Sequence, residues 1–148
     1  MAENRKAEAR RWFQESYYDL QAVRWNIQGK FYNTACFLAQ QSGEKALKSL
    51  LYYFGARKTA IHTHSLFEMT QTLVKEIPSL EILIKEAKEL DLHYVPSRYP
   101  NGLPGGFPHL FYESEMANKA LSSAEKLFSA AQNFYKWKEE EEILKSEE

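Results

Sequence analysis

Proline and glycine crowd one stretch of this chain, and no helix or strand of ordinary length crosses such a stretch. Between residues 96 and 109 the sequence carries Pro96, Pro100, Pro104, Pro108, Gly102, Gly105 and Gly106. Each proline lacks a backbone donor and disfavours helical geometry in the residue before it, while glycine permits turns that other residues resist. The sequence therefore predicts a stiff, irregular loop. Two interpretations stay open: a scaffold for a functional site, or a crossover between the ends of a bundle.

Apolar residues outside this loop recur at intervals of three and four, the spacing of amphipathic helices. The pattern predicts helices over about 5–28, 31–54, 65–75, 79–93 and 112–137. Gly29 and Gly55 are stop signals for the first two helices, and Ser65 with Glu68 has the spacing of a capping box. No alternating strand pattern occurs. The expected fold is all-α, an up-and-down antiparallel helical bundle of about five helices with a Pro/Gly-rich loop before the last helix.

The length of 148 residues suits one hydrophobic core without disulfides or a structural metal. We expect a helical bundle domain over residues 1–138 and a charged C-terminal tail over 139–148. The tail should be solvated and fray, with little reason to pack beyond Ile143 and Leu144. The single cysteine, Cys36, lies in an apolar run, which favours a buried side chain in a reducing compartment. No apolar run is long enough to cross a bilayer, so we expect a cytoplasmic protein.

Gly43 falls inside the second predicted helix, where glycine costs roughly 1 kcal/mol relative to alanine. Close approach of another helix would compensate, because a missing Cβ lets two backbones come together. That helix belongs either to this chain or to a second subunit. Together with the broad apolar faces of the helices, Gly43 therefore motivates the prediction of a homodimer.

Four polar side chains of the second predicted helix share one of its sides, because helical neighbours are three and four residues apart. They are Gln41, Glu44, Lys45 and Lys48. Spacing alone also fits a solvated face on which Glu44 pairs with Lys48. The sequence therefore leaves a ligand-binding face and an ordinary exposed face as alternatives.

Arg98 lies in the stiff loop, shortly after Asp91 and Tyr94 at the end of the fourth predicted helix. An arginine held by a rigid loop is pre-organised for a phosphate or a carboxylate, because its planar fork makes two hydrogen bonds at once. The alternative is an intramolecular clamp on Asp91 or Glu44. The loop thus supplies a candidate binding residue together with its structural alternative.

Metal and cofactor chemistry has no support in the spacing of the polar residues. His62, His64, His93 and His109 form no metalloenzyme signature, and no paired CxxC motif occurs. His64 flanks the predicted cap of the third helix, where its ring packs or bonds to an end group. No P-loop, dinucleotide fingerprint or hydrolase motif is present. We therefore predict no metal and no cofactor.

Several short motifs together resemble the HEPN domains (higher eukaryotes and prokaryotes nucleotide-binding). The residues that carry the resemblance are Ala9–Trp12, Asp19, Leu20, Ala22, Gly29–Tyr32, Ala39–Gln41, Glu44–Lys48, His64–Leu66 and Arg98–Pro100. The resemblance covers about residues 7–135. It implies a helical bundle that commonly forms a homodimer, cytoplasmic in prokaryotes, whose relatives are often encoded beside a minimal nucleotidyltransferase in a two-component, toxin-antitoxin-like system.

The resemblance implies binding of a nucleotide, such as ATP or GTP, or of RNA. Arg98 and Lys45 or Lys48 would then meet phosphates while Tyr94 or Tyr99 stacks on a base. Gln41, Glu44 and Asp91 complete the expected ligand-binding set.

Other members of this family resemble metal-independent ribonucleases with an arginine, four to six intervening residues and a histidine. Here ten residues separate Arg98 from its next histidine, His109. This departure leaves enzymatic activity undecided. A metal-independent endoribonuclease using Arg98 and His109 stays one alternative function, and a structural dimerisation module is a second.

Overall fold

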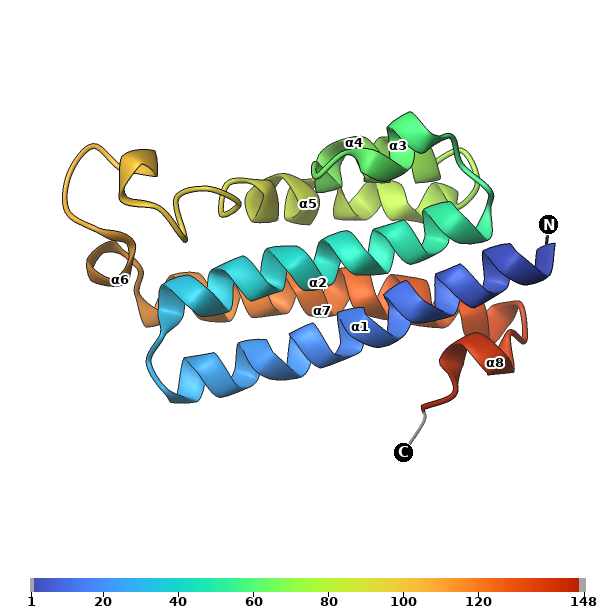
Figure 1. The fold of residues 1–148 in the computed structure, drawn as a ribbon, viewed down its shortest axis with the longest axis horizontal. Helices are drawn as coiled ribbons and strands as arrows, with labels where there is room; N and C mark the ends of the chain where they lie inside the picture. The colour runs from blue at the N-terminus through green and yellow to red at the C-terminus, as the bar shows by residue number, and fades with distance from the viewer. Residues whose placement is uncertain (1, 147–148) are drawn as a thin grey trace.

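A computed structural model describes residues 2–146 of the chain, and all regular structure in that part is helical (Figure 1). The elements are α1 (Ala2–Gln28), α2 (Tyr32–Tyr53), α3 (Lys58–His62), α4 (Leu66–Leu73), the 3₁₀ helix η1 (Pro78–Leu83), α5 (Ile84–Asp91), the 3₁₀ helix η2 (Pro100–Gly102), α6 (Pro108–Phe111), α7 (Ser114–Trp137) and α8 (Glu141–Leu144). The predicted all-α helical bundle is confirmed. Its five predicted helices correspond to α1, α2, α4, η1 with α5, and α7.

Three long helices, α1, α2 and α7, lie side by side, and α4 and α5 pack on α2 and α7 away from α1 (Figure 1). The turn between α1 and α2 is tight, because the amide of Phe31 donates to the carbonyl of Asn26 at 2.8 Å. Lys30 takes the left-handed conformation at φ 65°, rather than the predicted Gly29. Gly55, by contrast, takes φ 66° after α2, which suits a residue without a Cβ.

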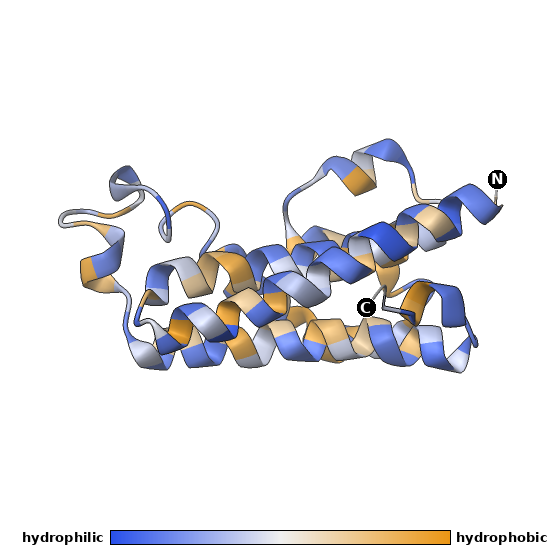
Figure 2. Cartoon of the chain, turned by 60° about the horizontal axis from the view of Figure 1, so that its bottom comes forward, coloured by the Kyte–Doolittle hydropathy of each residue, from blue (hydrophilic) through white to orange (hydrophobic). Residues whose placement is uncertain are grey.

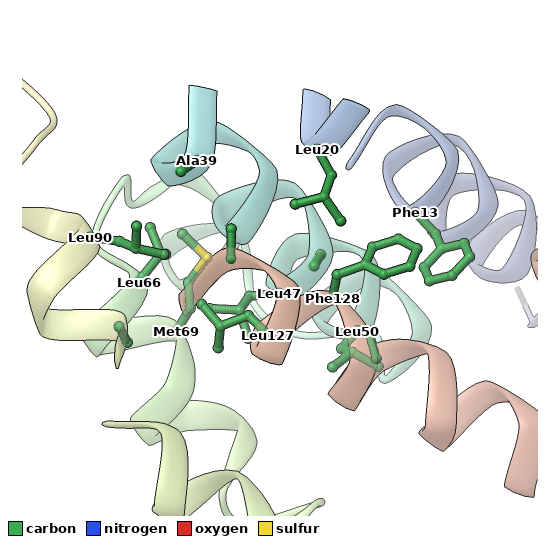
Figure 3. Packing of buried hydrophobic residues seen from close by; sticks show 14 of the residues in the cluster. Phe13, Leu20, Ala39, Leu47, Leu50, Leu66, Met69, Leu90, Leu127 and Phe128 are labelled. Carbon is green, nitrogen blue, oxygen red and sulfur yellow. The ribbon is translucent and has the colours of Figure 1, made fainter. Parts of the chain in front are cut away.

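Hydrophobic segments gather where the helices face one another (Figure 2). In the centre of the bundle the side chains come from α1, α2, α4, α5 and α7, and Figure 3 shows Phe13, Leu47, Leu66, Leu90 and Leu127 among them. Ser65 caps α4 as predicted, since its hydroxyl accepts from the amide of Glu68 at 3.2 Å. Cys36 is fully buried, as the sequence indicated.

Gly43 faces the core of its own chain. A Cβ built there would lie 2.7 Å from a methyl carbon of Leu66, 3.1 Å from one of Leu127 and 3.2 Å from one of Leu90. The close approach that compensates for this glycine therefore comes from α4, α5 and α7. Gly43 supplies no argument for a second subunit.

The Pro/Gly-rich segment is less irregular than expected, because it contains η2 and α6. Pro100 and Pro108 stand at the starts of these short helices, where a missing backbone donor costs nothing. Pro78 begins η1 in the same way, so the fourth predicted helix starts as a 3₁₀ helix. No peptide bond between residues 2 and 146 is cis.

The tail after residue 138 includes the short helix α8, and it contacts the bundle over the part that the structure describes. The side chain of Ile143 is buried against the bundle, and Arg10 of α1 donates to the carbonyls of Glu142 and Lys145 at 2.9 and 2.8 Å. Lys6 pairs with Glu140 at 3.0 Å. Glu139, Glu141, Glu142 and Lys145 are exposed, as expected of a charged tail, while Ile143 packs on the bundle. Residues 147 and 148 lie outside the described part.

Candidate functional site

The guanidinium of Arg98 lies among three aromatic rings. Its Cζ is 4.4 Å from the ring centroid of Phe37, 4.7 Å from that of Tyr94 and 4.9 Å from that of Tyr99. Its Nε donates to the backbone carbonyl of Tyr94 at 2.8 Å. Contacts of this kind hold a guanidinium by its faces and leave its outer nitrogens available. We call Arg98 with Phe37, Tyr94 and Tyr99 the Arg98 cradle.

Local hydrogen bonds fix the segment that carries Arg98. The amide of Tyr99 donates to the carbonyl of Val95 at 3.1 Å, which closes a helical turn around Arg98. The buried hydroxyl of Ser97 donates to the carbonyl of His93. Asn33 of α2 donates to the carbonyl of Ser97 at 3.0 Å, which ties the segment to the bundle. The cradle is therefore held by main-chain as well as ring contacts.

Nothing in residues 2–146 accepts a hydrogen bond from the two outer nitrogens of Arg98, and no carboxylate there pairs with it. Asp91 instead caps α4: its carboxylate accepts from the amides of Leu66 and Phe67 at 2.7 and 3.1 Å. Glu44 pairs with Lys48. The predicted alternative of a clamp between Arg98 and either carboxylate is therefore wrong.

The polar side of α2 forms a buried network instead of a solvated face. The Nζ of Lys48 lies 3.1 Å from Oε2 of Glu44, and their side chains are 7% and 6% exposed. Gln40 donates to Oε1 of Glu44 at 3.2 Å, and Gln41 donates to Oε1 of Gln40 at 2.7 Å. Because the carboxylate and the ammonium satisfy each other, they are stable away from water.

Lys45 and Lys48 point their charges toward α1. Lys45 pairs with Asp19 at 2.6 Å, and Nζ of Lys48 lies 5.3 Å from the ring centroid of Trp12. Both contacts join α2 to α1. The predicted residues of α2 thus share one side of the helix, and their side chains pair with other residues of the same chain.

His64 joins the Arg98 cradle to this network. Its Nδ1 lies 3.4 Å from Oε2 of Glu44, and its ring stacks on that of Tyr94 with 5.2 Å between centroids and 19° between planes. Sequence reasoning placed His64 at the flank of the α4 cap and in one of the family motifs, but not in the ligand-binding set. The contact with Tyr94 spans thirty residues of sequence, and no spacing rule signals it.

His109 lies elsewhere. Its ring is 6.0 Å from that of Phe31 at the start of α2, whereas Arg98 contacts Phe37, about 9 Å farther along the helix axis. No hydrogen bond or ring contact within residues 2–146 joins Arg98 to His109. The folded chain therefore does not by itself assemble the arginine and histidine expected of a ribonuclease.

Burial shifts the pKa of three titratable groups on or next to α2, α5 and α7, which are Cys36, His93 and Tyr112. Burial raises the pKa of the Cys36 thiol to about 12, so the thiol is not a nucleophile at neutral pH. Burial lowers the pKa of His93, and the charge of Glu89 opposes this in part. Burial, helped by Cys36, raises the pKa of Tyr112 to about 12.

Two hollows on the surface are lined by residues outside the cradle. One of about 960 Å³ lies between η1 and α7, and one of about 590 Å³ lies along α1 beside Trp12 and Lys45. Neither is lined by Arg98. In residues 2–146 no group of three or more acidic, histidine or cysteine side chains could hold a metal ion, and no helix could span a membrane.

The family model of the HEPN domain matches residues 9–140, and the chain therefore belongs to the HEPN domain family. Among solved structures it is similar to TT1696 from Thermus thermophilus, with 31% identity and a TM-score of 0.79 over 85% of this chain and 97% of that one. No curated protein matches the chain.

Two further solved structures carry the family name in their descriptions. ST0689, an archaeal HEPN homologue, is 28% identical with a TM-score of 0.68, over 85% of this chain and 96% of that one. The HEPN domain protein TM0613 from Thermotoga maritima is 26% identical with a TM-score of 0.67, over 85% and 98%. The predicted family is confirmed.

Proposed function

We propose that this HEPN-domain protein binds a nucleotide or RNA at the Arg98 cradle. The observation that carries the proposal is a guanidinium held by three rings with its two outer nitrogens free of partners in residues 2–146. Such a fork makes two hydrogen bonds at once to a phosphate or a carboxylate, and nucleotides and RNA supply phosphates. Tyr99 is half exposed beside it and supplies a surface on which a base stacks.

The other predicted site residues support this surface in different ways. Tyr94 contacts the guanidinium directly, while Asp91 holds the start of α4 beside the segment. Glu44 and Lys48 form a buried ion pair, which is connected to Tyr94 of the cradle through His64. Gln41 and Lys45 extend the polar side of α2, and Lys45 meets a ligand phosphate when its pair with Asp19 opens.

The decisive experiment is a titration of Arg98→Ala and Arg98→Lys with ATP, GTP and a short single-stranded RNA. We expect alanine to weaken binding about tenfold or more, because one charge-assisted interaction is lost. Lysine restores only part of the affinity, since it lacks the planar fork. Arg57→Ala is the matched control, because Arg57 is an exposed arginine at the start of α3. Unchanged affinity in Arg98→Ala, with thermal unfolding also unchanged, would reject the site.

Cleavage and stability measurements on variants of this protein distinguish the two alternative functions. A metal-independent endoribonuclease would cleave RNA in EDTA and lose that activity in His109→Ala. A structural dimerisation module would neither bind nor cleave, and Arg98→Ala would lower its melting temperature. The separation of Arg98 from His109 favours binding over cleavage within one chain.

We also propose a cytoplasmic homodimer that acts with a minimal nucleotidyltransferase in a two-component, toxin-antitoxin-like system. The segments before and after the cradle expose further large apolar side chains, which are Leu92, Val95, Phe107, Leu110, Phe111 and Met116. Such a patch is typical of an interaction surface, and we assign it to a second copy of this chain. Light scattering should give a dimer mass that Leu110→Glu reduces. Co-purification with an adjacently encoded nucleotidyltransferase tests the partner.

A further inference from the structure

His64 occupies a position that the proposed binding of phosphate leaves unexplained. Its side chain is 58% exposed, yet one ring nitrogen reaches the buried carboxylate of Glu44 and one ring face covers Tyr94. Tyr94 in turn contacts Arg98 through both its ring and its backbone carbonyl. A continuous line of contacts therefore runs from α2 through the imidazole to the guanidinium.

The carboxylate favours one tautomer of the neutral imidazole. An ionised carboxylate oxygen only accepts, so a hydrogen bond across the 3.4 Å contact with Oε2 of Glu44 places a proton on Nδ1. In this neutral tautomer Nε2 carries a lone pair and accepts hydrogen bonds, so it cannot donate one to a phosphate oxygen. Nε2 has no hydrogen-bond partner in residues 2–146. When the ring gains its second proton, Nε2 becomes a donor and the ring becomes a cation.

We propose that His64 is the positioning residue for Arg98 and makes the affinity of the cradle for phosphate rise as the pH falls. Stacking of the imidazole holds Tyr94 against the guanidinium at every pH. Protonation adds one positive charge and one donor, a single tyrosine ring away from Arg98. The inference rests on the proposed function, because it concerns the same phosphate-binding surface.

The other charged and titratable groups around His64 are not expected to change the phosphate affinity in the pH range where a histidine does. Glu44 and Lys48 face it from α2, Glu68 and Asp91 lie at the start of α4, and Tyr94 and Arg98 come from the segment after α5. Carboxylates, ammonium groups, phenols and guanidinium groups ordinarily keep their charge between about pH 5.5 and pH 8, whereas imidazoles change theirs. A step in that interval therefore reports a histidine.

The test measures binding of a uridine hexanucleotide without terminal phosphates, whose charge stays constant between about pH 8 and pH 5.5. For the wild type we expect affinity to rise about tenfold on acidification, the size of one charge-assisted hydrogen bond. His64→Phe keeps the stacked ring, so it should match the wild type at pH 8 and show no step. His64→Ala loses the ring as well and should bind more weakly at both pH values.

The controls are His62→Phe, an exposed histidine two residues away, and His109→Phe, both of which should retain the step. A wild type with pH-independent binding, or a His64→Phe protein that keeps the step, would overturn the inference while leaving the proposed function intact. Absence of RNA binding at both pH values overturns both.

A measurement without ligand tests the same contact. Long-range proton–nitrogen NMR spectra of the histidine rings should show the proton of neutral His64 on Nδ1. In Glu44→Gln the side-chain amide can accept or donate, so the preference for that tautomer should weaken. A wild-type ring with its proton on Nε2 would contradict the inference.

Discussion

Asp91 and Arg98 are seven residues apart in the sequence and serve different parts of the fold. The carboxylate of Asp91 accepts from two amides and from the hydroxyl of Ser65, so it satisfies donors that the first turn of α4 leaves unpaired. The two outer nitrogens of Arg98, by contrast, have no acceptor in residues 2–146. A negative charge committed to a helix start therefore leaves the neighbouring positive charge open to a ligand.

Gly43 gives the sharpest prediction for a single residue. Gly43→Ala gains about 1 kcal/mol of helix propensity, but its new methyl group would lie 2.7 Å from Leu66 and force the core to shift. Overpacking of this kind costs about 1–3 kcal/mol, so we expect a net loss of stability of up to about 2 kcal/mol in urea unfolding.

Gly105→Ala is the matched control, because nothing lies within 4 Å of a Cβ built at that glycine. Its free energy of unfolding should stay the same or rise by less than about 1 kcal/mol. A Gly43→Ala protein as stable as Gly105→Ala would show that the core around α2 has room to relax.

At the scale of secondary structure elements, α8 is a charged segment that is attached to the bundle by one buried apolar side chain, that of Ile143. Residues 139–142 are all glutamate, which by composition indicates a solvated tail. Ile143 nevertheless packs into the bundle at 2% exposure, and Arg10 satisfies two backbone carbonyls near it. Glu139, Glu141 and Glu142 are exposed, whereas Glu140 is mostly buried and pairs with Lys6 and Tyr53.

Ile143→Ala should therefore destabilise the whole domain and not only the tail. Truncation of a fully buried isoleucine costs about 2–5 kcal/mol, and we expect the lower half of that range because α8 is at the edge of the bundle. Chemical unfolding measures the loss. Amide exchange of α8 should also become faster.

Ile82→Ala makes the same chemical change at a side chain that is 80% exposed. It should alter the free energy of unfolding by no more than about 0.5 kcal/mol. Equal effects of the two substitutions would mean that α8 contributes no packing energy.

At the scale of the whole molecule, the stability of the bundle should depend on pH through His93. Its Nδ1 lies 3.0 Å from the hydroxyl of Tyr112, and burial lowers its pKa although Glu89 opposes the shift. The folded chain then binds a proton at His93 less readily than the unfolded chain. Stability from this residue is therefore complete above the unfolded pKa of about 6.5 and is lost as the pH falls toward the folded value.

Thermal or urea unfolding between about pH 7 and pH 5 checks this sign. The free energy of unfolding should fall more steeply for the wild type than for His93→Gln, whose amide keeps a polar contact with Tyr112 without titrating. His62→Gln, at an exposed site, should follow the wild type. A His93→Gln protein with the wild-type slope would assign the acid sensitivity to other groups.

The helical fold was predictable because its causes are local. Apolar periodicity, the cap at Ser65 and the prolines act within a few residues, so the positions of the main helices followed from them. The family followed from the resemblance of several short motifs, and the family model confirms it. The short helices η2 and α6 were missed because a proline at a helix start carries no penalty. The helices α3 and α8 are only five and four residues long, too short to show a helical period. The homodimer and the partner enzyme remain predictions.

The sequence by itself determined a helical bundle with Arg98 on a stiff segment. Only the tertiary structure decided that Phe37 from α2 and two tyrosines hold that guanidinium, that Glu44 belongs to Lys48, and that His64 lies beside Tyr94. These contacts join residues from separate helices. Their partners are selected by three-dimensional packing and burial, which no local spacing of residues encodes.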